Sequence, residues 1–244
     1  MIDRIVPLNL GMLEVDKSLQ MSLCDIGKSI WVACIAWYLE GNGTRILIDS
    51  GPADKEWSEK YHRKLQREKN NTLRESLKKV GVSPEEISLV INTHLHWDHC
   101  YGNSELRNAD IIVQRDELMY AIAPYSRDSR MYEADLGSPA ILGCLDRIRT
   151  VDGDKTIISG IDVIKTPGHT PGSQGVAVET RKGVYFLAGD TFGLYENLEF
   201  SPPWPPGIFV DLGAFYRSAE KVLKIADYIL PGHDPAVFEK QSYP

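Results

Sequence analysis

Several features that would define other classes of protein are missing from this sequence of 244 residues. Its four cysteines, Cys24, Cys34, Cys100 and Cys144, form no Cys-x-x-Cys pair, so neither a disulfide framework nor a cysteine-rich zinc site is expected. Its hydrophobic runs fall short of the roughly 20 residues that span a bilayer, and the first apolar segment does not have the pattern of a signal peptide. The sequence therefore favours a cytoplasmic protein with reduced thiols.

Positive charge is also in short supply. The chain has 27 Lys and Arg against 34 Asp and Glu, which gives a net charge of −7. This acidic balance provides no general attraction to nucleic acid or to an anionic membrane surface. Because no repeat or low-complexity linker divides the chain, we expect a single domain over residues 1–244 that acts on a small molecule. The sequence does not decide between a monomer and a homodimer.

Histidine is scarce as well, but its positions are informative. The chain has six histidines, and three of them lie in the short run HLHWDH. His94 and His96 follow an apolar, strand-like run at a spacing of two, so both side chains leave the same face. Asp98 and His99 come after a turn and are expected to face a neighbouring point. Neutral imidazole and carboxylate suit zinc and similar divalent metals.

Two more histidines and an aspartate follow later apolar runs, each flanked by glycine or proline. His169 lies in TPGHTPG, Asp190 in LAGDT and His233 in LPGHDP. Such strand-to-loop junctions often carry active sites. The resulting seven nitrogen and oxygen donors are too many for one zinc ion, so they predict two metal ions that share a bridge. His62 is an exception, because it lies in a charged helical pattern and is predicted to be a surface residue.

The apolar pattern predicts two groups of strands, each followed by helices. Strands are expected at residues 2–8, 31–39, 44–49, 87–92, 111–114, 147–151, 161–166, 175–179, 184–188 and 228–230, with a hairpin turn at 41–43. Helical spacing runs from Trp57 to Val80, and further helices are expected from 83, at 115–123 and at 211–226. This order favours two β-sheets packed face to face with helices outside.

Taken together, these residues make the sequence resemble the metallo-β-lactamase superfamily. The resemblance implies an α/β (α+β) fold, a four-layer αβ/βα sandwich of two mixed β-sheets flanked by helices. It also implies one metal held by His94, His96 and His169, a second held by Asp98, His99 and His233, and Asp190 as the bridge. Two zinc ions are the expected pair, and iron, manganese or cobalt would suit the same ligands.

Within the superfamily, the sequence is most similar to the N-acyl homoserine lactonase-like group, through THLHWDHCYGN, TPGHTPGSQG and ADYILPGHDP. This resemblance implies a quorum-quenching type of hydrolase, in which a metal-bridging hydroxide opens a lactone or carboxylic ester. Asp98 is implied to carry the proton to the leaving oxygen, Asp49 to support a ligand histidine and Tyr195 to contact the substrate. Two features depart from that group. Tyr195 lies later after Asp190 than in the best-known lactonases, and Ser173 stands where they often carry histidine.

The segment after Asp190 is rich in aromatic residues and proline. It contains Phe192, Tyr195, Phe200, Trp204 and Phe209, with Pro202, Pro203, Pro205 and Pro206. It predicts either a stiff apolar wall for an acyl group or a crossover packed on the core or on another subunit. Cys100, next to His99, is predicted to be a small buried side chain rather than a metal ligand.

Other activities on this fold are the alternatives. A thioester hydrolase similar to glyoxalase II would share the histidine motif, but that family adds a helical extension with basic glutathione-binding residues. An iron-dependent oxidoreductase is the second alternative. Its flavodiiron type usually replaces the second histidine by a carboxylate, whereas this chain has His96, and persulfide dioxygenases use a single iron. A nuclease should carry a basic exosite, and a non-catalytic metal-binding scaffold would not need Asp98.

Overall fold

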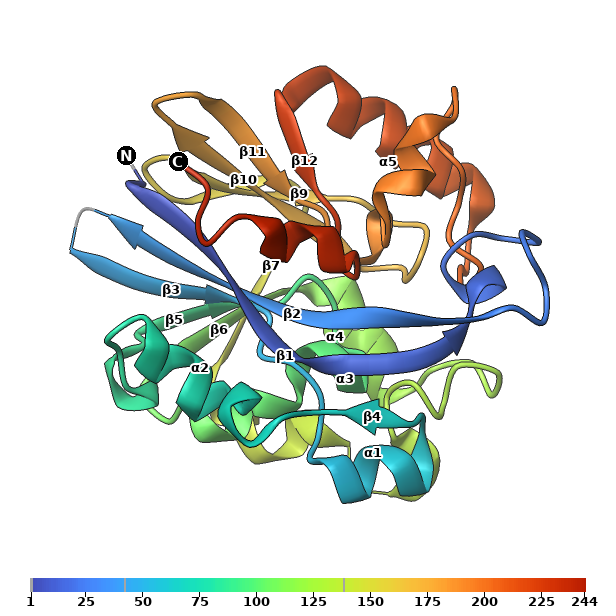
Figure 1. Cartoon of the computed structure of the whole chain (residues 1–244), viewed down its shortest axis with the longest axis horizontal. Helices are drawn as coiled ribbons and strands as arrows, with labels where there is room; N and C mark the ends of the chain where they lie inside the picture. Colours follow the sequence, from blue (N-terminus) through green and yellow to red (C-terminus); the bar gives the residue numbers. More distant parts are fainter. Residues whose placement is uncertain (1, 42, 138) are drawn as a thin grey trace.

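The computed structural model describes residues 2–41, 43–137 and 139–244, and the strands in these ranges form two sheets (Figure 1). The first sheet has the order β4-β1-β2-β3-β5-β6-β7. Its members are β1 (Arg4–Asp16), β2 (Ser29–Gly41), β3 (Thr44–Ile48), β4 (Leu65–Gln66), β5 (Leu89–Ile91), β6 (Asp110–Gln114) and β7 (Ile148–Val151). The pairs of β1 with β2 and of β2 with β3 are antiparallel, whereas β3, β5, β6 and β7 run parallel, so the sheet is mixed.

The second sheet has the order β12-β11-β10-β9-β8. Its members are β8 (Lys155–Ile158), β9 (Ile161–Lys165), β10 (Gln174–Thr180), β11 (Gly183–Leu187) and β12 (Tyr228–Leu230). Strands β8 to β11 pair antiparallel, and β12 joins β11 in parallel. This sheet is therefore mixed too, as the resemblance implied.

Helices cover the outer faces of the two sheets (Figure 1). Four of them, α1 (Lys55–Tyr61), α2 (Leu73–Lys79), α3 (Trp97–Cys100) and α4 (Arg115–Ile122), lie against the first sheet, and α5 (Leu212–Ile225) lies against the second. Short 3₁₀ turns are η1 (Lys17–Leu19), η2 (Lys69–Asn71), η3 (Pro84–Glu86), η4 (Tyr101–Glu105), η5 (Ala134–Leu136), η6 (Ala140–Arg147), η7 (Gly189–Thr191), η8 (Tyr195–Glu199) and η9 (Pro235–Glu239). The predicted four-layer sandwich is thus confirmed.

Strand β2 shows why the layers hold together. Val32, Cys34, Ala36 and Tyr38 face the cluster under the helices, and the alternate residues Ala33, Ile35, Trp37 and Leu39 face the cluster between the sheets. Successive side chains of a strand point to opposite faces, and a strand buried on both faces appears in the sequence as one continuous apolar run. The second sheet contributes Val163, Val176 and Leu187 to the same inter-sheet cluster.

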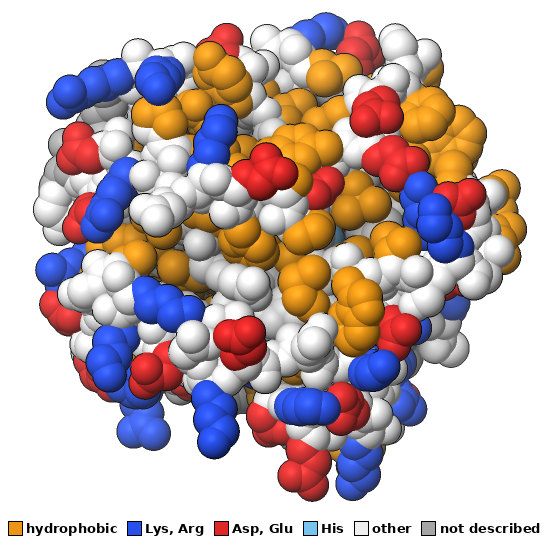
Figure 2. Space-filling view, viewed as in Figure 1, with side chains coloured by type: hydrophobic (Ala, Val, Ile, Leu, Met, Phe, Trp, Pro, Cys, Tyr) orange, Lys and Arg blue, Asp and Glu red, His pale blue; other side chains and the backbone are white. Residues whose placement is uncertain are grey.

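The surface agrees with the mixed charge of the chain. Figure 2 shows Lys and Arg interspersed with Asp and Glu over the helices of the first sheet, while hydrophobic side chains gather nearer the sheets. Among the described helices, none combines the length and the apolar character that crossing a bilayer requires.

The structure corrects the predicted elements at four places, one of which is the helix expected from residue 83, where only the 3₁₀ turn η3 forms. Strand β1 extends to Asp16 because a bulge at Gly11, with φ of +123°, lets the chain continue past the predicted end. The predicted helical run from Trp57 to Val80 is broken, since Leu65 pairs with Leu13 in a short edge strand. Strand β8 was not predicted. The hairpin between β2 and β3 is confirmed by its register, although Asn42 lies outside the described residues.

His62 is also not the surface residue that the sequence predicted. Its side chain is only 2% exposed, and its Nε2 lies 2.8 Å from Oε1 of the buried Glu133. Trp57 donates to the same oxygen through Nε1 at 2.6 Å, and the His62 ring stacks on Trp97 at 4.1 Å. The reason is that α1 ends at Tyr61, so His62 turns inward instead of continuing the exposed helical face.

Replacing Ile48 by alanine tests the inter-sheet core. Ile48 is fully buried in that cluster, so Ile48→Ala should lower the free energy of unfolding by about 2–5 kcal/mol, measured by urea denaturation. Ile26→Ala is the control, because Ile26 is 71% exposed. Equal losses in the two variants would contradict the proposed core.

Candidate metal centre

Seven candidate ligands converge where strands of both sheets end. His94 and His96 follow β5, Asp98 and His99 lie in α3, His169 follows β9, Asp190 lies in η7 after β11, and His233 follows β12. Since β11 and β12 are parallel, their carboxyl ends lie at one edge of the second sheet. That edge faces the carboxyl end of β5, and such ends commonly hold ligand sites in α/β sheets.

The ligand atoms form two groups. His94, His96, His169 and Asp190 make the first group, and Asp98, His99 and His233 make the second. Within each group the donor atoms lie within 4.8 Å of one another. The closest nitrogen pairs are His96 Nδ1 to His169 Nε2 at 3.1 Å and His99 Nε2 to His233 Nε2 at 3.2 Å.

Asp190 lies between the two groups and faces each with a different oxygen. Its Oδ1 lies 3.1 Å from His99 Nε2 and 3.0 Å from His233 Nε2. Its Oδ2 lies 3.2 Å from His169 Nε2 and 3.9 Å from His94 Nε2. This arrangement suits a carboxylate that shares its two oxygens between two metal ions.

Oxygen atoms behind the imidazoles fix the ring orientations. For four histidines, Nδ1 has an oxygen partner outside the two groups: Thr93 Oγ1 at 3.1 Å for His94, Asp49 Oδ2 at 2.8 Å for His99, the Ile208 carbonyl at 2.7 Å for His169 and the Ala33 carbonyl at 2.7 Å for His233. Such contacts hold a ligand histidine in one orientation and leave Nε2 for the metal. The predicted support from Asp49 is confirmed at His99.

Thr93 and Asp49 also fix the backbone of the histidine motif. The Thr93 N–H and hydroxyl both donate to the Asp49 carboxylate, each at 2.7 Å. Asp49 itself has φ of +58°, a conformation that aspartate and asparagine tolerate better than most residues. The carboxylate that supports His99 therefore also holds the chain just before His94.

Glu117 also holds two segments that carry candidate ligands, near Leu95 and near Thr170. It is fully buried, and its carboxylate accepts from the Leu95 N–H at 2.9 Å, the Tyr132 hydroxyl at 2.9 Å and the Thr170 hydroxyl at 2.5 Å. Burial raises the pKa of Glu117, and these donors oppose that effect. The network ties Leu95, between His94 and His96, to Thr170, next to His169.

The pKa values of the clustered aspartate and histidine side chains depend on one another. Burial raises the pKa of Asp190, but the surrounding imidazoles, His233 foremost, outweigh burial and hold that pKa well below its ordinary value. Burial, with neighbouring imidazoles, lowers the pKa values of His94 and His96 well below normal. An ionised Asp190 beside neutral His94 and His96 suits metal binding, whereas at His99 and His233 Asp190 outweighs burial and raises the pKa, so protons compete with a metal ion there.

The donor set fits divalent metal ions. His94 Nε2 and Asp98 Oδ1 are buried and have no hydrogen-bond partner among the described residues. Buried polar atoms are rarely left unpaired. The nitrogen pairs at 3.1 and 3.2 Å compare well with the separation of about 3.3 Å between two nitrogens on a tetrahedral zinc ion.

A narrow cavity of about 40 Å³ reaches the cluster at Asp98, Asp190 and His233. Its other walls are Leu13, Val15, Leu19, Gln20, Val32, Arg63, Trp97, Met131 and Ile208. Of the two residues predicted to be catalytic, Asp98 lines this cavity. Tyr195 instead packs against the inter-sheet cluster, and burial followed by the nearby Tyr243 raises its pKa. The structure therefore does not bring Tyr195 to the cavity, and its catalytic role stays a prediction.

The remaining predicted residues have structural roles. Cys100 is buried, and its thiol donates to the Leu95 carbonyl, as expected for a small buried side chain. Ser173 Oγ accepts from the Thr170 N–H at 2.8 Å and so closes the turn after His169. In the aromatic segment, Phe192 is buried in the cluster under α5, which agrees with a crossover packed on the core.

Sequence reasoning missed Glu117, Thr93 and the cavity residue Gln20. Thr93 directly precedes His94 and could have been noticed as a polar residue at the same strand end. Glu117 gave no such signal, because its partners lie 15 to 53 positions away along the chain.

Two mixed sheets with a histidine and aspartate cluster at their shared edge define the metallo-β-lactamase type of domain. The model of the Metallo-beta-lactamase superfamily matches residues 30–233, and the chain belongs to this superfamily. It is similar to an N-acyl homoserine lactonase of Bacillus cereus, with 35% identity over 160 residues, 65% of this chain and 60% of that protein. It is also similar to the N-acyl homoserine lactonase AttM of Rhizobium radiobacter, with 29% identity over 175 residues, 66% of this chain and 63% of that protein.

The chain thus spans about 60% of the length of the curated lactonases that it matches. Among solved structures, an N-acyl homoserine lactone hydrolase with N-hexanoyl-L-homoserine at its metal centre superposes with a TM-score of 0.80. Its sequence identity is 24%, and 98% of this chain and 96% of that chain are covered. The dizinc quorum-quenching lactonase AidC gives a TM-score of 0.73 at 20% identity, covering 96% and 90%. These structures share the fold.

The Asp49 carboxylate gives a test of the centre. Asp49→Asn keeps the size and the backbone conformation but removes the charge behind His99, so we expect zinc affinity to fall about 10- to 100-fold. Competition with a chromophoric chelator measures the affinity, and circular dichroism checks the fold. Asp110→Asn on the surface is the matched control. Unchanged affinity in Asp49→Asn would rule out this supporting role.

Proposed function

We propose that this protein is a dinuclear metal-dependent hydrolase that opens a lactone or carboxylic ester, in the manner of an N-acyl homoserine lactonase. His94, His96 and His169 would hold one metal ion, Asp98, His99 and His233 would hold the other, and Asp190 would bridge the two. The observation that carries the proposal is the position of Asp190, whose two oxygens face different groups of imidazoles. We propose zinc as the metal, with iron, manganese or cobalt as substitutes.

Two divalent ions in this centre would supply a hydroxide nucleophile near neutral pH and would polarise a carbonyl oxygen. Among the described residues, the cavity lining contains no Ser, Thr or Cys that could act as a hydroxyl or thiol nucleophile. Asp98 lines the cavity, and its Oδ1 is unpaired. We assign Asp98 to take up the proton released during attack and to pass it to the leaving alkoxide oxygen.

The apolar residues that line the small cavity favour an apolar group next to the reacting carbonyl. Leu13, Val15, Leu19, Val32, Met131 and Ile208 surround the polar floor, as in many sites where a few polar groups orient a mostly apolar ligand. The names of the Bacillus and Rhizobium relatives support an N-acyl homoserine lactone as the first substrate to test. We further propose one domain over the whole chain, a homodimer as the assembly to test, and a reducing compartment such as the cytosol, which suits the three buried free thiols.

A substrate panel tests the proposed reaction. The purified protein should contain two metal ions per chain and should release protons from N-acyl homoserine lactones, with slower turnover of simple lactones and aryl esters. Elemental analysis and a pH-indicator assay measure both. Turnover of S-lactoylglutathione alone would favour the thioester hydrolase instead. A single iron with oxygen uptake would overturn the hydrolase class.

Asp98→Asn tests the proton transfer. The amide cannot accept the proton, so we expect turnover to fall by roughly 10²- to 10⁴-fold while both metal ions remain by elemental analysis. Asp152→Asn on the surface should have no effect. If Asp98→Asn keeps its metals and its full turnover, Asp98 is not the proton carrier.

A further inference from the structure

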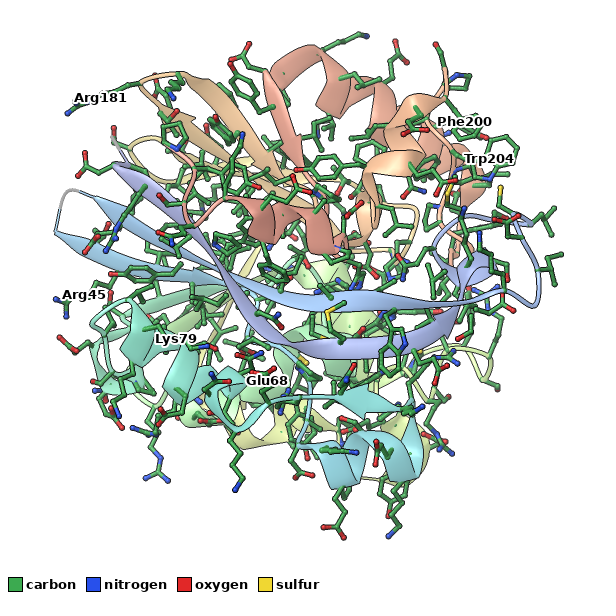
Figure 3. The ribbon with its side chains drawn as sticks, viewed as in Figure 1. Arg45, Glu68, Lys79, Arg181, Phe200 and Trp204 are labelled. Atoms are coloured by element: carbon green, nitrogen blue, oxygen red, sulfur yellow. The ribbon has the colours of Figure 1, made fainter. Side chains whose placement is uncertain are left out.

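One polar wall of the cavity comes from the segment between β1 and β2, residues 17–28, which we call the β1–β2 strap. It contains η1 and lies beside the segment that follows Asp190 (Figure 1). Figure 3 labels Phe200 and Trp204 at the same end of the molecule. Gln20 lies in this strap and lines the cavity together with Asp98, Asp190 and His233.

The backbone around Gln20 is anchored on both sides. Its carbonyl accepts from Asn197 Nδ2 at 3.0 Å, and the carbonyl of Leu19 accepts from the Gly207 N–H at 3.0 Å. Lys17, which precedes it, pairs with Glu196 at 2.8 Å. Because none of these contacts uses the Gln20 side chain, its replacement should leave the strap in place.

The Gln20 carboxamide is packed against Gly193. A Cβ atom at position 193 would lie 2.0 Å from Gln20 Oε1 and 4.0 Å from Cδ2 of His233. The carbonyl of Gly193 also accepts the His233 N–H at 2.8 Å. Glycine therefore leaves room for the carboxamide directly beside a candidate metal ligand.

This carboxamide makes no hydrogen bond with any side chain or backbone group that the structure describes. Outside the two ligand groups, the other lining side chains with a hydrogen-bond donor are Arg63, which is exposed, and Trp97, whose ring is stacked on His62. Gln20 thus presents a neutral donor next to the centre from an anchored backbone, and its carboxamide is free to bind a ligand.

We propose that the Gln20 carboxamide donates a hydrogen bond to the scissile carbonyl oxygen of the substrate, and that Gly193 makes room for it. The proposal rests on the hydrolase function above. Negative charge develops on that oxygen when the carbonyl carbon is attacked, so a donor that is held next to it by an anchored backbone stabilises the transition state more than the ground state. Gln20 would then be a catalytic residue, because it contacts the substrate. Its replacement would not remove the metal ions.

Two substitutions separate hydrogen bonding from packing. Gln20→Leu removes the donor, and Gln20→Met keeps the length of the side chain without a charge but also lacks the donating N–H₂. Both should lower kcat by roughly 100-fold with little change in KM, at unchanged metal content and thermal stability. Gln241→Leu, on the exposed surface, is the matched control. Full kcat in Gln20→Leu or in Gln20→Met would overturn the proposal.

Gly193→Ala tests the same contact from the other side. Its Cβ should displace the carboxamide and lower kcat in the wild-type background, but should have little further effect in Gln20→Leu. Additive losses would mean that Gly193 acts independently of Gln20 and would contradict the proposal.

A binding measurement keeps this inference separate from the proposed function. In protein labelled with ¹⁵N-glutamine, the side-chain resonance missing from Gln20→Leu identifies Gln20, and it should shift when N-hexanoyl-homoserine, the ring-opened hydroxy acid, is added to the metal-loaded protein. Wild-type turnover and calorimetric binding without that shift would overturn the role of Gln20 alone. A wild-type protein that neither turns over lactones nor binds the hydroxy acid would overturn the proposed function, and this inference with it.

Discussion

The ionised carboxylate of Asp190, buried among imidazoles, is the constraint on which the rest of the site depends. Burial alone would favour its neutral form, and the imidazoles of His233, His99, His169 and His94 reverse that preference. A buried charge is tolerated only where its surroundings compensate it. The two strand ends of the second sheet and the histidine motif of the first must therefore meet around one side chain, which fixes how the two sheets are stacked at this edge.

Close packing at that edge explains the glycines that flank the ligands. A Cβ at Gly189, just before Asp190, would lie 2.7 Å from the Thr93 side chain, and one at Gly232, just before His233, would lie 2.5 Å from the Gly189 carbonyl. Gly189 also has φ of +50°. The Gly-Asp and Gly-His pairs that are visible in the sequence thus mark points where three chain segments approach within van der Waals contact.

The sequence predicted the cluster of histidine and aspartate side chains and the stacking of two sheets, because both follow from local patterns. Each segment that carries candidate ligands follows an apolar run within a few residues, and β2 shows its burial as an unbroken run of apolar residues. The sequence did not predict His62 as a buried residue or Glu117 as a buried acceptor, because burial there is decided by distant partners. Glu133 lies 71 positions from His62, and Thr170 lies 53 positions from Glu117. Leu65 fitted helical spacing, but pairing with Leu13 in β1 overrode that local pattern.

Different physical constraints act on the wall of the cavity and on its floor, which Asp98, Asp190 and His233 form. The floor contains charged groups that metal ions would neutralise. A further charged side chain beside it would interact more strongly with the metal ions than with a substrate. A lysine or arginine at position 20 would be repelled by two divalent cations, and a carboxylate would compete to bind them. A carboxamide carries no net charge and is a weak ligand, yet it still donates hydrogen bonds. That balance gives a physical reason for the strap to present glutamine at this point, and for the segment after Asp190 to present glycine opposite it.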